Sequence, residues 1–176
     1  MAVRAEAFGA ERRGEAALYG GIQSSQVWQD VVSHPDSEEF YDDGLIGISY
    51  AQFRPFGRFG IYGGVEAQAN LHFGGQTYGE FNLPFVLRYE PKWSLPVRSF
   101  AYGLGPSLTT DVPDIEVDKG GASQRVLFYW YMEAEFGYAR QRFNPFLRLH
   151  HRSNGFDTFE QPGSSNAIVL GLRRRY

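Results

Sequence analysis

A histidine and a serine separated by one position are the residues with the clearest potential for chemistry. His151 and Ser153 fall in the segment 145–153, where apolar and polar residues alternate as in a strand. Residues i and i+2 of a strand share a face, with Cα atoms roughly 6.6 Å apart. An imidazole and a hydroxyl in that arrangement can reach hydrogen-bond distance, which is what a base and its nucleophile require for acyl transfer.

Two donors follow this pair directly in the chain. Asn154 and Gly155 can supply a side-chain amide or backbone N–H groups to an oxyanion. His-x-Ser by itself is a weak pattern, and a histidine and a serine at a strand end in a lipid headgroup region are the alternative interpretation. Spacing alone leaves both interpretations open.

The elements that must position these residues are strands, because period-two alternation recurs along the chain. The segment 58–73 is the clearest, with apolar residues or glycine at odd positions and mostly polar residues or glycine at even ones. The same alternation marks residues 77–89, 98–110, 126–138 and 168–176, and weaker strands are predicted at 15–28, 45–53 and 145–153. We therefore predict eight strands and no helix.

The two faces of these strands predict which side of a barrel is outside. The apolar faces are long and carry aromatic residues near both ends. The polar faces combine small residues with opposite charges, namely Glu66, Glu80, Glu133 and Glu135 and, facing them, Arg58, Arg88, Arg148, Arg152 and Arg173. An apolar exterior around a charged, narrow lumen is typical of a membrane barrel, whereas a soluble lipocalin-like barrel has the reverse arrangement. The fold class predicted is all-β, an eight-stranded antiparallel transmembrane β-barrel.

Composition limits the remaining classes of protein. The chain has 176 residues with 43% hydrophobic residues, which fits a single domain over 1–176 with 1–13 as an N-terminal extension. The absence of cysteine excludes disulfides, thiolate zinc sites and cysteine nucleophiles. A formal charge of −3 gives no reason to expect nucleic acid as a partner. The N-terminus lacks the apolar stretch of a signal peptide, so we expect either a cytoplasmic protein or a mature form.

The sequence predicts no metal site. His34, His72 and His150 do not show metal-ligand spacing. The acidic segment 30–43 could bind Ca²⁺ that bridges lipopolysaccharide phosphates, but a solvated loop is the favoured interpretation.

Around His151 the chain resembles a known family. Residues 146–156 (FLRLHHRSNGF) and 162–172 (PGSSNAIVLGL) are similar to PagL-type lipid A 3-O-deacylases, outer-membrane barrels with an H-x-S-N motif near the top of the penultimate strand. The resemblance implies that His151 is the general base, Ser153 the nucleophile and Asn154 an oxyanion contributor. It also implies lipid A or lipopolysaccharide as substrate and outer-membrane lipids as surroundings. Chemistry by a histidine and a serine implies no cofactor, and a homodimer is left open.

The third member of the family's catalytic set departs from the pattern. Members of the family carry an acidic residue early in the last strand, and strand parity places Asn166 there. Asn166 can accept a hydrogen bond from the imidazole but cannot stabilise an imidazolium ion by charge. We therefore expect Asn166→Asp to raise activity or leave it unchanged. Glu160 or Asp157, in the preceding loop, are substitutes for the orienting role. A non-catalytic outer-membrane barrel with a structural or binding role is the alternative function, and a soluble lipid-binding barrel is the third.

Overall fold

Nine strand segments make up most of the protein. The computed structural model describes residues 12–33, 40–57, 59–93, 96–138, 141–155 and 158–176. The strands are β1 (Arg13–Ser24), β2 (Phe40–Pro55), β3 (Ile61–Phe73), β4 (Tyr78–Asn82), β5 (Phe85–Tyr89), β6 (Val97–Thr109), β7 (Val126–Phe136), β8 (Phe143–Ser153) and β9 (Ser164–Arg175). β1 therefore begins at the last residue of the predicted N-terminal extension.

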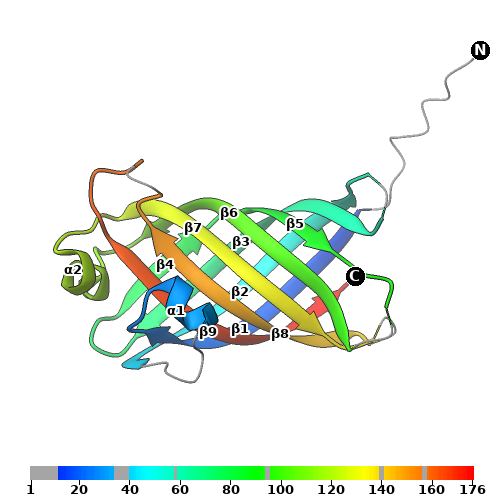
Figure 1. The fold of residues 1–176 in the computed structure, drawn as a ribbon, viewed down its shortest axis with the longest axis horizontal. Helices are drawn as coiled ribbons and strands as arrows, with labels where there is room; N and C mark the ends of the chain where they lie inside the picture. The colour runs from blue at the N-terminus through cyan, green and yellow to red at the C-terminus, as the bar shows by residue number, and fades with distance from the viewer. Residues whose placement is uncertain (1–11, 34–39, 58, 94–95, 139–140, 156–157) are drawn as a thin grey trace, which may run out of the picture.

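The strands close into one antiparallel barrel (Figure 1). β1 pairs with β2 on one side and with β9 on the other, so the first and last strands complete the ring. β4 and β5 are two halves of a single strand, because both pair with β3 and β6 in one continuous register. The interruption falls at Leu83 and Pro84, since proline has no N–H to donate to the ladder. The predicted eight-stranded antiparallel β-barrel is confirmed.

Two short helices lie in the connections, and there the prediction of no helix is wrong. α1 (Trp28–Ser33) follows β1, and α2 (Asp114–Gly120) lies between β6 and β7. α2 ends at Gly121, whose left-handed φ of 78° suits a helix C-terminus. Helices of six and seven residues are too short to produce a helical period in the sequence. Neither is long or apolar enough to cross a membrane.

The barrel turns its apolar face outward, as predicted. Along β3, Val65 and Leu71 are about half exposed, whereas Glu66, Gln68 and Asn70 are buried. Large apolar side chains are exposed in the same way on the other strands. This orientation is the reverse of that in a lipocalin, and it suits a barrel surrounded by lipid.

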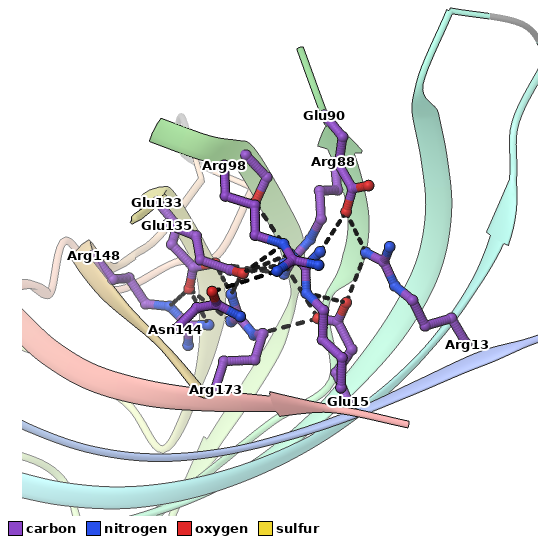
Figure 2. A network of polar contacts seen from close by, with 12 residues as sticks. Arg13, Glu15, Arg88, Glu90, Arg98, Glu133, Glu135, Asn144, Arg148 and Arg173 are labelled. Carbon is purple, nitrogen blue, oxygen red and sulfur yellow. Dashed lines mark hydrogen bonds and ion pairs between the residues drawn. The ribbon is translucent and has the colours of Figure 1, made fainter. Parts of the chain in front are cut away.

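The lumen is filled by a network of arginine and glutamate side chains (Figure 2). Glu133 lies at its centre and pairs with Arg148 at 2.7 Å, with Arg88 at 3.4 Å and with Arg173. Arg148 also pairs with Glu66 at 3.0 Å. The four glutamates predicted to face inward, Glu66, Glu80, Glu133 and Glu135, are all buried. Charges at this depth must be paired to be tolerated, and the network supplies the partners.

Some pairings differ from those expected from strand parity. Glu80 lies between His72 at 2.6 Å and His150 at 3.2 Å, and not beside an arginine. Arg152 pairs with Glu116 of α2 and not with a strand glutamate. The network also includes four charged residues that strand parity did not predict there, namely Arg13, Glu15, Glu90 and Arg175. Arg58 lies outside the described residues.

Candidate functional site

His151 lies on the outer wall of the barrel and is nevertheless buried, because aromatic side chains pack against it. Strand alternation points His151 and Ser153 outward, while His150 and Arg152 point into the lumen. The imidazole ring of His151 lies 4.6 Å, centroid to centroid, from the indole ring of Trp130 on β7. Trp28 of α1 packs edge-on against that indole. In Figure 1, α1 lies over this outer side of the barrel. As a result, His151 is only 6% exposed.

Asn166 holds His151 in one tautomer. The two residues are direct cross-strand partners in β8 and β9, and Nδ1 of His151 lies 2.5 Å from Oδ1 of Asn166. The amide nitrogen of Asn166 donates to the backbone carbonyl of Gln26 at 2.7 Å. The Gln26 carbonyl can only accept a hydrogen bond, so the amide nitrogen must face it and the amide oxygen must face the histidine. Nδ1 therefore carries the proton, and Nε2 of the neutral ring keeps the lone pair that a general base needs.

Ser153 is close to this base in the fold but is not bonded to it. Within the described part of the chain, no hydrogen bond joins the Ser153 hydroxyl to His151. Both side chains line one groove of about 650 Å³ on the outer wall, together with Asn154, Gly155 and Asn166. We call this concavity the lateral groove. Catalytic hydrogen bonds are commonly loose without substrate, and both side chains project from one strand face.

The turn after Ser153 depends on glycine. Gly155 has a φ of +64°, a region that L side chains rarely adopt. A Cβ atom built there would lie 2.0 Å from Cδ2 of Phe128, so no larger residue fits. The turn is closed by the N–H of Phe159, which donates to the carbonyl of Asn154 at 3.1 Å. Gly155 thus fixes the chain direction at the predicted oxyanion donors.

The other predicted site residues lie apart from this arrangement. Glu160 is exposed, does not line the lateral groove and makes no contact with His151 among the described residues. Asp157, His34 and the central part of the acidic segment, residues 34–39, lie outside the described residues. In the part of the chain that is described, no three His, Asp or Glu side chains gather as metal ligands. Of the two orienting candidates that the structure describes, Asn166 and Glu160, Asn166 is the one that contacts His151.

The remaining wall of the lateral groove is mostly apolar, and no motif in the sequence indicates it. Its lining includes Val27, Trp28, Tyr102, Leu104, Phe128, Trp130 and Met132. These residues come from three separate segments of the chain, residues 27–28, β6 and β7, and no motif in the sequence links them. A concavity of this size and polarity suits a hydrocarbon chain, with His151, Ser153 and Asn166 at one side of it.

Comparison with known proteins supports the fold. No family model and no curated protein matches the chain. The crystal structure of the outer membrane enzyme PagL superposes with a TM-score of 0.64 and 12% identity, over 91% of this chain and 98% of that one. The structure of Neisserial surface protein A, NspA, gives a TM-score of 0.54 and 11% identity over 94% and 99%. The chain therefore has the fold of outer-membrane barrels, and one of these neighbours is an enzyme.

Proposed function

We propose that the protein is an outer-membrane serine esterase that hydrolyses an ester-linked acyl chain of lipid A or lipopolysaccharide. The observation that carries the proposal is the Asn166–His151 hydrogen bond, which leaves Nε2 of His151 as a base on the face it shares with Ser153. Support for the substrate class comes from the H-x-S-N resemblance and from the apolar lateral groove.

The reaction would follow the chemistry of a serine–histidine pair. Nε2 of His151 takes the proton from the Ser153 hydroxyl as its oxygen attacks the ester carbonyl. Asn154 and the backbone at Gly155 donate to the oxyanion of the tetrahedral intermediate. The imidazolium then returns its proton to the leaving sugar oxygen. Water, deprotonated by the same imidazole, releases the fatty acid and restores Ser153, so no metal or redox cofactor is needed.

The barrel surface provides a route for such a substrate. The lumen is occupied by the ion-pair network, whereas the lateral groove lies on the outer wall. An acyl ester embedded in the membrane could therefore reach Ser153 by moving within the bilayer, without passing through the barrel. This is why we place the protein in the bacterial outer membrane, with its lipids as the reaction medium.

A non-catalytic barrel with a structural or binding role is the second candidate. Two observations favour it: an amide stands where a carboxylate would stabilise the imidazolium, and Ser153 is not hydrogen-bonded to His151 in the described residues. In that case the lateral groove would bind a lipid chain without cleaving it.

Mass spectrometry of lipid A separates the two candidates. Cells that produce the wild-type protein should yield lipid A lacking one ester-linked acyl chain, whereas Ser153→Ala and His151→Ala should leave lipid A intact. His150→Gln is the matched control, because it changes the neighbouring histidine on the lumen side and keeps a hydrogen-bond donor for Glu80. Identical spectra for wild type and Ser153→Ala, with both proteins in the membrane, would favour the non-catalytic barrel.

A further inference from the structure

A buried carboxylate from a loop helix contacts both strands that carry the candidate site. Glu116 of α2 is fully buried. Its Oε2 accepts from Arg152 of β8 at 2.5 Å and from Ser123 at 2.5 Å, and its Oε1 accepts from Ser165 of β9 at 2.9 Å. In Figure 1, α2 lies at the end of the barrel opposite the chain termini. One side chain thus connects this loop to the ends of two neighbouring strands.

The two strand residues that Glu116 holds are paired directly behind the site. Arg152 is the cross-strand partner of Ser165, and the adjacent pair is His151 with Asn166. Because side chains alternate across a sheet, the first pair faces the lumen and the second faces outward. Glu116 therefore joins the inner faces of β8 and β9 one residue from the position where the His151–Asn166 hydrogen bond joins their outer faces.

Arg152 depends on this carboxylate for its counter-charge. The guanidinium donates to Ser107 at 3.0 Å and to the backbone carbonyls of Gln124 and Arg125 at 2.9 and 2.8 Å. Among the described residues, Glu116 is the one carboxylate paired with it. Arg152 is 1% exposed, and a buried cation without a partner is strongly destabilising. Since Arg152 stands between His151 and Ser153 in the chain, movement of its backbone would move both.

We propose that Glu116 is a positioning residue for the esterase reaction: by clamping Arg152 to Ser165 it holds β8 and β9 in the register that keeps His151 against Asn166 and beside Ser153. This role rests on the proposed function. The central lumen network around Glu133 does not include Arg152 or Ser165. Glu116 therefore connects the ends of β8 and β9 at a place that this network does not reach.

The test compares Glu116→Ala with Asp118→Asn, which removes the same charge from an exposed position of the same helix. Hydrolysis of a p-nitrophenyl fatty-acid ester is measured in detergent micelles, using protein whose unboiled gel migration shows a folded barrel. We expect Glu116→Ala to lower kcat at least tenfold with little change in KM, because the apolar lining of the lateral groove comes from residues 27–28, β6 and β7, which Glu116 does not contact. Asp118→Asn should match wild type. A wild-type kcat in folded Glu116→Ala would overturn the proposal.

A second readout does not need catalysis. The short hydrogen bond to Asn166 should give the Nδ1 proton of His151 a downfield NMR resonance in protein with ¹⁵N-labelled histidine. Glu116→Ala should shift or broaden it, and Asp118→Asn should not. The comparison can be made in a Ser153→Ala background, so it remains informative even where the wild type proves inactive and the proposed function fails. If Glu116→Ala does not fold, Glu116→Gln is measured in its place. An unchanged His151 resonance and an unchanged kcat in Glu116→Gln would refute the positioning role of Glu116.

Discussion

Asn166 presents its carbonyl oxygen, and not its amide nitrogen, to His151. The nitrogen donates to the carbonyl of Gln26 at 2.7 Å, and the oxygen accepts from Nδ1 of His151 at 2.5 Å. A single amide therefore satisfies two neighbours of opposite hydrogen-bonding character. A carboxylate has no donor for the Gln26 carbonyl, so an aspartate at position 166 should fit the site less well than asparagine.

Asn166→Asp should lower activity, the opposite of the sign expected from the sequence. One carboxylate oxygen would still accept from His151, but the other would face the Gln26 carbonyl at the distance of a hydrogen bond with no proton between them. We expect kcat on a micellar ester substrate to fall about tenfold, the equivalent of about 1.4 kcal/mol. Asn166→Ala, which removes the tautomer lock without adding the repulsion, serves as comparison. A kcat equal to or above wild type for Asn166→Asp would show that the residues around Gln26 can move away.

Glu133→Gln should strongly destabilise the barrel. Glu133 is shared by Arg88, Arg148 and Arg173, and loss of its charge leaves three buried cations with fewer counter-charges. Breaking a buried ion pair costs about 3–5 kcal/mol, to be measured as the free energy of unfolding in urea with detergent micelles. Glu90→Gln is the control at the rim of the network, where the side chain is 22% exposed, and it should cost at most about 1 kcal/mol. Equal losses for the two variants would argue against the central place given to Glu133.

Gly155→Ala should impair activity, because it disturbs the turn that follows Ser153. The added Cβ would meet Phe128 at 2.0 Å, in addition to the strain of a positive φ. Gly57→Ala is a matched control: its φ is +74°, but the space around a Cβ is open and it lies in the β2–β3 connection, between strands remote from β8 in sequence. The backbone strain alone costs about 1–3 kcal/mol. Esterase rates compared at equal amounts of folded protein should fall for Gly155→Ala and stay near wild type for Gly57→Ala.

The apolar exterior should make the protein depend on detergent. With residues such as Leu18, Ile48 and Leu170 more than half exposed, the folded barrel should aggregate without micelles or lipid. On gels, unboiled samples should migrate differently from boiled ones, because the closed barrel resists unfolding by detergent alone. A monomer that stays soluble without detergent and migrates identically under both conditions would contradict a membrane barrel.

Strand positions and the direction of each face follow from the sequence alone. Alternation is a local property, so the segment 58–73 was enough to show that Glu66 and Val65 must face opposite sides. The same parity predicts that His151, Ser153 and Asn166 share one outer face. The inward direction of Glu80 and Glu133 followed in the same way, because a narrow lumen is the place where charges can find partners.

Only the tertiary structure decided which groups meet. Glu80 contacts two histidines and Arg152 contacts Glu116, because the contacts depend on how far each side chain reaches across the closed lumen. The Gln26 carbonyl, 140 residues from Asn166 in the chain, is a backbone group that every residue type carries, so no residue pattern could reveal it. It reaches the site because α1 packs over the outer wall. An amide at position 166 can donate to this carbonyl, whereas a carboxylate cannot.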